Sequence, residues 1–389
     1  MIDRIDLFMP PRSLYQVLHY FTKNLSDALT RCGVRCRILE AERDKPQQFI
    51  DTLLEDPPQC TLSFNGLLPD EEGRFFCDLI RIPHVACLVD APHHFLALTK
   101  SPYSIITSVD RFGCEFFQGM NFQNVLFMPH AVDKKLIQEP AKNEKRDIDV
   151  LLLASFIDYE SIREKWQKEL PQPIAKAMEY AAELTLKERN TPYIHALVQA
   201  LDVATKQHGV DVRTLDFISL IDQLEDYING KDRVELVKAI TDAKIKIYGA
   251  GSHKWESELK NKSNVTLHEP IDYLEALQLM RRSKIVLNSC PSIRGGAHER
   301  IFAGIASGAA VVTNETLYMM ENFKQNKDIL FYQYTKRDSI NSLINEYLSD
   351  ESKRQALVHA SQETVKKGHT WDHRAADLLN KLEPILPNI

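Results

Sequence analysis

The part of the sequence best suited to chemistry is a unit between Lys284 and Asn314, KIVLNSCPSIRGGAHERIFAGIASGAAVVTN. An apolar run over 285–287 predicts a buried strand, and a polar loop that contains glycine follows it. A short helix is expected from about Glu299 to Ser307, because Gly308 suits the left-handed conformation that ends a helix. The loop therefore opens at a helix N-terminus, where unpaired N–H groups and a partial positive charge favour an anion such as phosphate.

Charged residues and glycines surround this helix start. Arg294 and Arg300 lie on either side of the loop and add positive charge, and the glycine pair after Arg294 would let a ligand approach the backbone closely. In the alternative, structural interpretation, Glu299 only complements the helix dipole, Arg300 is solvated and His298 caps the helix. A simple connection does not need the glycines, so the sequence favours a phosphate site. Its candidate residues are Arg294, Gly295, Gly296, His298, Glu299 and Arg300.

A second loop, Gly249-Ala250-Gly251, follows an apolar strand predicted over 244–248. A lone glycine pair after a strand is a weak signal, because a tight turn also explains it. Its weight increases because the strand falls in the same predicted sheet as the unit over 284–314. Two strand-end loops in one half-sheet indicate that Gly249 and Gly251 contact the same ligand.

The first third of the sequence contains short apolar strands that alternate with helical patterns, which indicates βαβ units and a parallel sheet. Ligands of open α/β sheets bind outside the carboxyl ends of the strands. Asp90 and His94 follow one such end, and we interpret them as a general acid/base pair or as partners of a sugar hydroxyl. Packing or capping is the alternative for both. Asp-x-x-His-His without a third ligand is poor evidence for a metal, so no metal site is predicted. The expected strands cover residues 5–9, 34–39, 60–64, 84–89, 104–108 and 125–128.

The length of 389 residues predicts two domains, because a single core of that size is unusual. The polar stretch 129–146, which has two prolines and no apolar periodicity, marks their boundary. We expect an N-terminal α/β domain over 1–140, rejoined by a last helix at 372–389, and a second α/β domain over 147–371 that contains both candidate ligand-binding loops. A helical segment of about four helices, 159–243, interrupts the second domain. It would shape an acceptor site, form a homo-oligomer interface or only enlarge the domain.

The composition excludes several classes of protein. Hydrophobic residues make up 44% and charged residues 26% of the chain, as in a globular protein with a sizeable core. The formal net charge of −6 argues against nucleic acid or an anionic membrane as the main partner. Seven cysteines without a CxxC pair are typical of reduced, buried thiols. The N-terminus lacks the apolar core of a signal peptide, and no apolar stretch approaches the ~18 residues that cross a bilayer. We expect a cytoplasmic protein that is not transmembrane.

Two α/β domains, a phosphate-binding strand–loop–helix in the second and a last helix that returns to the first together resemble the GT-B glycosyltransferases. The segment RGGAHERIFAGIASGAAVVTN is similar to the donor-binding region of the group 1 transferases, in particular of the subgroup similar to the spore-maturation protein CgeB. The segments ACLVDAP, IDVLLLASFIDYESIRE and GHTWDHRAADLL also resemble that subgroup. The resemblance implies that the domains over 1–140 and 147–371 are Rossmann-like and face a cleft, that the second binds the nucleotide sugar, and that the helical segment is an insertion in it.

The resemblance also implies roles for the matching residues. Arg300 matches the arginine before the helix, which is expected to meet the diphosphate of the donor. Glu299 and His298 fall where contacts to the donor sugar or phosphate are expected. The loop at Gly249 matches the loop that contacts the nucleotide.

Two positions depart from the family pattern. The family commonly has a glutamate, which holds the ribose, followed by an alanine, where this sequence has Ala303 and Gly304. Gly295 stands where the wider group has its first acidic residue. Either Glu299 takes over part of this role, or the donor is held differently, or activity is lost.

The leading hypothesis is a metal-independent, retaining glycosyltransferase of the hexosyltransferase type, which moves a sugar from a nucleotide sugar to a glycan, a protein or a small molecule. The nucleotide sugar is its substrate, and no cofactor is expected. Asp90, His94 and Glu299 would be catalytic. Asp90 and His94 would face the loop at Glu299 across the cleft. Positioned arginines and helix N–H groups stabilise charge on the leaving diphosphate, which allows the reaction without a metal.

Two alternatives stay open at this point. One is a sugar-nucleotide epimerase of the same fold, which would use Asp90 and His94 as an acid/base set. The other is a binding or scaffold protein, in which Ala303 marks a decayed site and the helical segment is the working surface.

Overall fold

The computed structural model describes residues 2–41, 46–138 and 145–388. The chain divides into two compact units, one formed by residues 1–138 and 365–389 and the other by residues 139–364. The boundary expected between residues 140 and 147 falls partly on residues that lie outside the described ranges.

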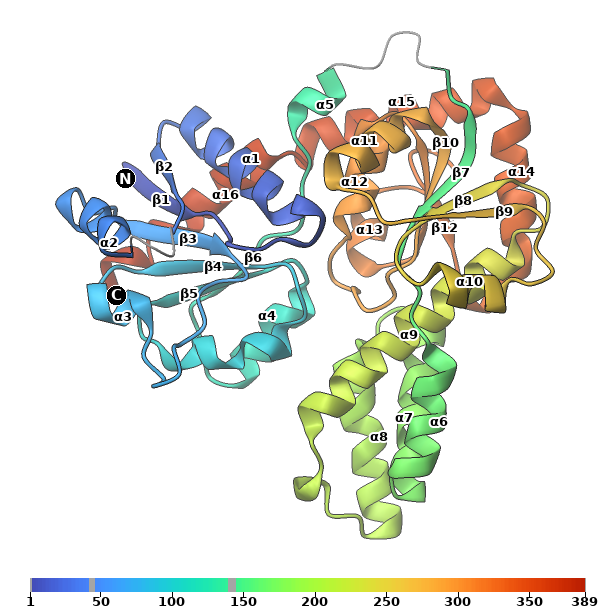
Figure 1. The fold of residues 1–389 in the computed structure, drawn as a ribbon, viewed down its shortest axis with the longest axis horizontal. Helices are drawn as coiled ribbons and strands as arrows, with labels where there is room; N and C mark the ends of the chain where they lie inside the picture. The colour runs from blue at the N-terminus through green and yellow to red at the C-terminus, as the bar shows by residue number, and fades with distance from the viewer. Residues whose placement is uncertain (1, 42–45, 139–144, 389) are drawn as a thin grey trace. The chain divides into compact units, whose positions relative to one another are not determined.

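The first unit is built on a six-stranded parallel sheet with the order β2-β1-β3-β4-β5-β6 (Figure 1). The six strands predicted from apolar runs are confirmed, and their ends agree within one residue. Four inner strands are buried along their whole length, whereas the edge strand β2 is partly exposed. Strands covered on both faces require such continuous apolar runs. The strands are β1 (Arg4–Phe8), β2 (Arg35–Leu39), β3 (Cys60–Phe64), β4 (His84–Leu88), β5 (Ser104–Ser108) and β6 (Val125–Phe127).

Helices cover this sheet, and two of them come from opposite ends of the chain. The first long helix, α1, packs against α16, which follows the second unit in sequence. On the other side of the unit, α4 contacts β5 and β6 (Figure 1). The helices are α1 (Val17–Arg31), α2 (Pro46–Glu55), α3 (Phe76–Ile80), α4 (Arg111–Gly119), α5 (Lys134–Gln138) and α16 (Trp371–Leu382), with 3-10 turns η1 (Leu14–Gln16), η2 (Pro92–Lys100) and η5 (Leu386–Asn388).

The second unit contains another six-stranded parallel sheet, with the order β12-β11-β10-β7-β8-β9. From β7 the chain adds β8 and β9 on one side, and it then returns to add β10, β11 and β12 on the other. The direction of winding therefore reverses between β7 and β10, and such a switch point leaves a crevice at the carboxyl ends of the two strands. The strands are β7 (Ile148–Leu153), β8 (Ile245–Tyr248), β9 (Val265–His268), β10 (Ser283–Asn288), β11 (Ala310–Asn314) and β12 (Leu330–Tyr332).

Aspartates begin several helices of the second unit. Asp158 accepts a hydrogen bond from the N–H of Ser161 at the start of α6, and Asp272 forms a capping box with Glu275 at the start of α11. A carboxylate at this position satisfies a free N–H and complements the helix dipole. The helices are α6 (Tyr159–Glu169), α7 (Gln172–Lys187), α8 (Tyr193–His208), α9 (Phe217–Ala239), α10 (Ser252–Glu258), α11 (Tyr273–Arg282), α12 (Glu299–Ala306), α13 (Leu317–Asn322), α14 (Ile340–Ser349) and α15 (Glu351–Gly368), with 3-10 turns η3 (Val212–Thr214) and η4 (Tyr334–Ser339).

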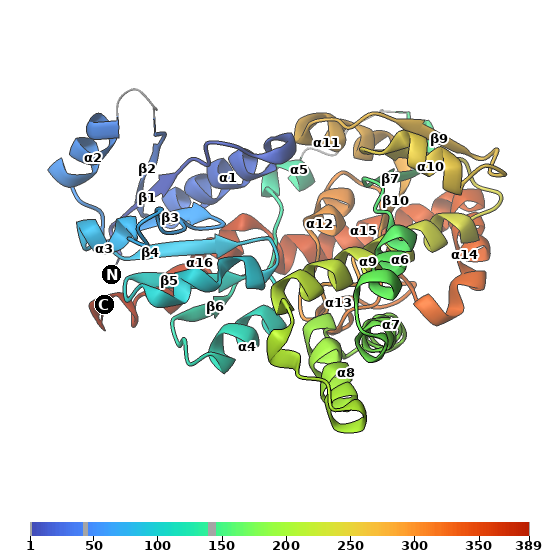
Figure 2. The same ribbon diagram turned by 60° about the horizontal axis from the view of Figure 1, so that its bottom comes forward.

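The helices α6, α7, α8 and α9 lie between β7 and β8 and form what we call the helical insert. Figures 1 and 2 show α6, α7 and α8 extending away from the second sheet, whereas α9 returns to it. The buried sides of α7 and α8 carry alanines, among them Ala181, Ala182, Ala196 and Ala200. Small side chains let two helices approach closely, which explains the extensive packing of α7 on α8.

Aromatic and polar contacts hold the last helix, α16, to the rest of the first unit, and two of its buried residues, Trp371 and Arg374, make several of them. The buried ring of Trp371 lies 5.4 Å from that of Phe21. The guanidinium of Arg374, which is 7% exposed, donates hydrogen bonds to the backbone carbonyls of Pro129 at 2.8 Å, His130 at 3.1 Å and Gly368 at 2.9 Å. This arginine satisfies three carbonyls that no regular element pairs.

Replacement of Arg374 by alanine is expected to lower the free energy of unfolding of the first unit by about 2–4 kcal/mol, because buried carbonyls lose charge-assisted hydrogen bonds. Hydrogen–deuterium exchange at graded urea concentrations, read by mass spectrometry, separates the peptides of the two units. Arg213→Ala is the matched control, because the Arg213 side chain is 87% exposed. Equal stability of the two variants would contradict this role of Arg374.

Candidate functional site

The start of α12 has the geometry that the sequence predicts. β10 ends at Asn288, α12 begins at Glu299, and Gly308 beyond its end has a φ of +77°. The Nδ1 of His298 accepts a hydrogen bond from the backbone N–H of Arg300 at 3.2 Å. His298 is therefore the N-cap of α12, which is the role that the structural interpretation gave it.

Arg300 is fixed at the carboxyl edge of the second sheet. Its Nη1 donates a hydrogen bond to Oδ1 of Asn288 at 3.1 Å, and Nδ2 of Asn288 donates to Oγ1 of Thr313 at 3.0 Å. Asn288 ends β10 and Thr313 lies near the end of β11. The guanidinium is thus held by two neighbouring strands at the edge where ligands of α/β sheets bind.

Glu299, the first residue of α12, is a poorly solvated acid. Its side chain is 14% exposed, and its Oε2 is buried without a hydrogen-bond partner among the described residues. Burial raises the pKa of Glu299 to about 7, and the charge of Arg300 opposes that shift. A carboxyl with a pKa near neutrality can both accept and donate a proton at physiological pH.

Arg294 occupies a different position from Arg300. It is 5% exposed, and its Nη2 donates a hydrogen bond to the carbonyl of Thr185, in the last turn of α7. A cation at a helix C-terminus satisfies a free carbonyl and complements the dipole. The glycine pair beside it is buried, and the carbonyl of Gly296 accepts a hydrogen bond from Oγ1 of Thr316 at 3.0 Å. The loop around Arg294 therefore joins the sheet to the helical insert.

The loop after β8 is pressed against the end of β7. A Cβ on Gly249 would lie 2.3 Å from the carbonyl oxygen of Ala154, so only glycine fits there. Gly251 has a φ of +83° and precedes α10. The Oγ of Ser155 accepts a hydrogen bond from the N–H of Ala250 at 3.2 Å. Backbone packing explains Gly249, and its contact with a nucleotide stays a prediction.

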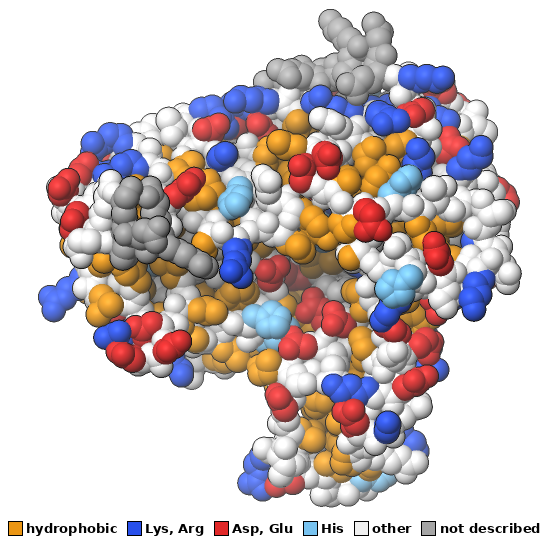
Figure 3. All heavy atoms as spheres, in the orientation of Figure 1, with side chains coloured by type: hydrophobic (Ala, Val, Ile, Leu, Met, Phe, Trp, Pro, Cys, Tyr) orange, Lys and Arg blue, Asp and Glu red, His pale blue; other side chains and the backbone are white. Residues whose placement is uncertain are grey.

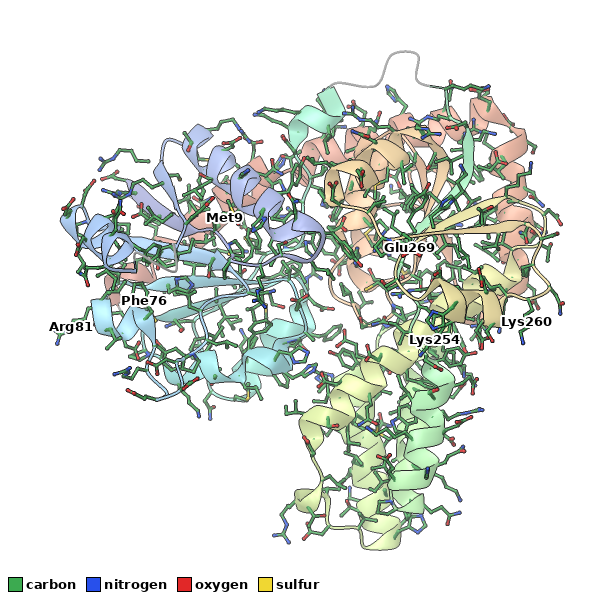
Figure 4. The ribbon with its side chains drawn as sticks, viewed as in Figure 1. Met9, Phe76, Arg81, Lys254, Lys260 and Glu269 are labelled. Carbon is green, nitrogen blue, oxygen red and sulfur yellow. The ribbon has the colours of Figure 1, made fainter. Side chains whose placement is uncertain are left out.

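Charged side chains of both signs surround the loop after β8. The Nζ of Lys254 donates a hydrogen bond to Oδ2 of Asp158 at 3.1 Å, and Oγ of Ser252 donates to Oε1 of Glu269 at 3.4 Å. Lys254 and Glu269, which Figure 4 labels, come from α10 and from the residue after β9. These groups offer both donors and acceptors at the carboxyl edge of the sheet.

Sequence reasoning missed the contribution of α9. Asp232 is 1% exposed, and its Oδ2 accepts hydrogen bonds from Oγ of Ser289 at 2.6 Å and from the hydroxyl of Tyr332 at 2.5 Å. Burial raises the pKa of Asp232, and these two hydrogen bonds oppose the shift. The next residue, Arg233, donates from Nη1 to the carbonyl of Ser155. Two consecutive residues of the helical insert therefore reach the carboxyl ends of β7, β10 and β12.

A small hollow, with a cavity volume of about 50 Å³, opens beside Asp232. Arg294 lines it, and Nε of Arg189 pairs with Oε2 of Glu315 at 2.7 Å among its lining residues. Tyr332 and Tyr334 add aromatic faces and hydroxyls. This lining supplies charges of both signs and hydroxyl groups.

In the first unit, Asp90 and His94 lie at the end of β4, and both are exposed. The Oδ2 of Asp90 accepts a hydrogen bond from Nδ2 of Asn65 at 2.6 Å. Asn65 follows β3, so two strand-end residues meet here. His94 belongs to η2, and its ring lies 4.3 Å from that of His93. The catalytic roles of Asp90 and His94 stay predictions.

On the face that Figure 3 shows, acidic and basic side chains are interspersed, in keeping with a net charge of −6 on the chain. The positive charge of Arg300 is therefore a local feature of the sheet edge. In the part of the chain that the structure describes, no helix has the length and apolar character that a membrane span requires.

Two doubly wound parallel sheets, with charged loops at the carboxyl edge of the second, define the class of protein: the chain has the GT-B fold of glycosyltransferases. The prediction of two Rossmann-like α/β domains is confirmed. Residues 232–380 match the family model described as "Glycosyl transferase-like". The matched region contains the loop after β8, the whole strand–loop–helix unit and most of α16, so the glycosyltransferase resemblance is confirmed at the level of this broad family.

Solved structures with the same fold cover nearly the whole chain. Sucrose-phosphate synthase from Thermosynechococcus elongatus is 10% identical, with 100% of both chains covered and a TM-score of 0.56. Anabaena HepE in complex with UDP-glucose is 11% identical, with 98% of this chain and 99% of that chain covered and a TM-score of 0.53. A glycosyltransferase from Rickettsia africae is 9% identical, with 100% of both chains covered and a TM-score of 0.54. No curated protein matches the chain.

The raised pKa of Glu299 predicts a pH-dependent stability. Because the folded state binds this proton more tightly than the unfolded state, the contribution of Glu299 to stability is full below its ordinary pKa and is lost as the pH rises through about 7. Glu299→Gln removes this loss. The free energy of unfolding of the variant minus that of the wild type is therefore expected to increase by about 2 kcal/mol from pH 5 to pH 8.

Urea unfolding at both pH values measures the difference. The control is Glu164→Gln, which removes an exposed carboxylate from α6. If the wild type and Glu299→Gln lose stability in parallel over this range, Glu299 is not an acid with a raised pKa.

Proposed function

We propose that this protein is a metal-independent, retaining glycosyltransferase of the CgeB-like subgroup, which transfers a hexosyl or related sugar from a nucleotide sugar. A glycan, a protein or a small molecule would accept the sugar. The observation that carries the proposal is the position of Arg300, anchored to Asn288 at the carboxyl edge of the second sheet and inside the glycosyl transferase-like region.

The chemistry needs charge stabilisation at this edge. When the bond between the anomeric carbon and the phosphate oxygen breaks, its electron pair stays on the diphosphate. A fixed guanidinium stabilises the departing diphosphate more strongly than the bound donor, since the charge on the bridging oxygen grows in the transition state. Arg300 is held for this task before any ligand arrives.

Acid and base groups would complete the site. Glu299, with a pKa of about 7, would exchange a proton with the donor sugar or its phosphate. Asp90 and His94 of the first unit would bind or deprotonate the acceptor hydroxyl. HepE, which has the same fold, was solved with UDP and with UDP-glucose, so a uridine nucleotide is the first donor to test.

The proposal is tested by incubating the protein with UDP-, GDP-, ADP- and dTDP-sugars, with and without EDTA, and measuring the released nucleoside diphosphate. We expect one donor class to turn over at the same rate in EDTA. NMR of the product identifies the anomeric configuration. Absence of both binding and turnover with every donor would refute the proposal, and conversion of the donor without an acceptor would indicate an epimerase.

Arg300→Ala is expected to lower kcat/KM for the donor by about 100-fold, because the leaving diphosphate loses one charge-assisted contact. The matched control is Arg163→Ala, which removes an exposed arginine of the same unit, 44% exposed and paired with Glu160. Steady-state kinetics measure kcat/KM for the donor in both variants. A comparable rate in the two variants would remove Arg300 from the reaction.

A second candidate function, nucleotide-sugar binding without turnover, is favoured by one observation. Ala303 is 1% exposed inside α12, at the place where the family resemblance predicts a ribose-binding glutamate. Donor affinity measured by calorimetry, together with no released nucleotide for any acceptor tested, would favour this role over catalysis.

A further inference from the structure

The helix α9 of the helical insert passes directly over the end of β7. A Cβ on Gly230 would lie 2.8 Å from the carbonyl oxygen of Ile157, so helix and loop are in close backbone contact. One turn further along α9, Nη1 of Arg233 donates a hydrogen bond to the carbonyl of Ser155. Figures 1 and 2 show α9 running from the helical insert to the second sheet. Arg233 is thereby held at the crevice where the winding of the sheet reverses.

Arg233 and Arg300 are held at the ends of two paired strands, because Arg233 donates to the carbonyl of Ser155 after β7 and Arg300 donates to Asn288 at the end of β10. Burial and the charge of Arg300 lower the pKa of Arg233 to about 10. The Nε of Arg233 is buried and has no hydrogen-bond partner among the described residues. Two guanidiniums at neighbouring strand ends, one of them with an unused buried donor, favour binding of an anion there.

Neighbouring carboxylates do not fully neutralise the positive charges of Arg233 and Arg300. Asp232 is adjacent in sequence, and its charge offsets part of the positive charge of the pair, while its Oδ2 accepts hydrogen bonds from Ser289 and Tyr332. Glu299 has a pKa of about 7, so near neutral pH a substantial fraction of it is protonated and uncharged. The pair therefore keeps a net positive charge at the carboxyl edge of the sheet.

The surroundings of Arg233 match a nucleotide diphosphate better than a free ion. Ser155 links Arg233 to the loop after β8, because its carbonyl accepts from Arg233 and its Oγ accepts from the N–H of Ala250. Arg300 lies on the other side of the end of β7, where it is hydrogen-bonded to Asn288 at the end of β10. A ligand with its nucleoside at the loop after β8 would bring its phosphates to both arginines.

We propose that Arg233, which the helical insert supplies, binds the diphosphate of the nucleotide sugar together with Arg300. This assignment rests on the proposed function and adds a binding residue to it. The planar guanidinium fork suits phosphate oxygens, so that Arg233 acts through directed hydrogen bonds as well as through charge. The helical insert is then part of the donor site.

Isothermal titration calorimetry on the full chain tests the assignment, with UDP, ADP, GDP and dTDP as probes and the matching nucleosides as references. Arg233→Gln is expected to weaken binding of the preferred nucleoside diphosphate by about 10- to 100-fold and to leave binding of the nucleoside unchanged. Arg233→Lys, which keeps the charge without the fork, should fall between Arg233→Gln and wild type. Arg213→Gln, an exposed arginine of the same insert, should match wild type.

The outcomes separate this assignment from the proposed function. A wild-type chain that binds none of the diphosphates overturns both. A wild-type chain that binds one of them, with Arg233→Gln equally tight, overturns the role of Arg233 alone, as does an equal loss for the nucleoside. A crystal structure of the wild-type chain with the preferred diphosphate covers the case in which Arg233→Gln does not fold. A phosphate oxygen within hydrogen-bond distance of Arg233 supports the assignment, and its absence refutes it.

Discussion

Close backbone contact at the carboxyl end of β7 is the constraint on which the second unit depends. The loop after β8 contacts Ala154 through Gly249, and α9 contacts Ile157 through Gly230. Any side chain at either glycine would collide with a carbonyl oxygen of the same short segment. Since protein interiors are close-packed, a shift of this segment is transmitted to its neighbours. The position of Arg233 beside the strand ends therefore follows from the absence of two Cβ atoms.

The same edge of the sheet holds charges that the protein leaves poorly compensated. Arg233 and Arg300 bring two positive charges to neighbouring strand ends, and Glu299 keeps a buried oxygen without a partner among the described residues. Groups of this kind lower the stability of a fold, and perturbed titration is typical of sites where a ligand or a reaction uses them. Their concentration in the glycosyl transferase-like region, on a GT-B fold, connects the electrostatics with the family match.

The sequence predicted the strands and α12 well because both depend on local signals. Continuous apolar runs mark strands buried on both faces, and Gly308 marks the end of α12. The role of α9 was not predictable in this way, because helical periodicity indicates a buried face without naming what covers it. One local sign was present: Gly230 lies inside a helix, where glycine is unfavourable, and it marks the contact with Ile157. The role of Arg294 in the phosphate site stays a prediction, and its bond to the carbonyl of Thr185 is a long-range contact that spacing cannot reveal.

The helical geometry of α9 limits how this chain can change in length. Each residue added to a helix rotates everything beyond it by about 100°. An insertion between the buried face at Leu220 and Leu224 and the contact at Gly230 would turn Arg233 away from Ser155 or disrupt the packing of the insert. The turn over 209–216, which joins α8 to α9, carries no such restriction. Natural length variation among relatives of this protein should therefore gather at the far end of the insert.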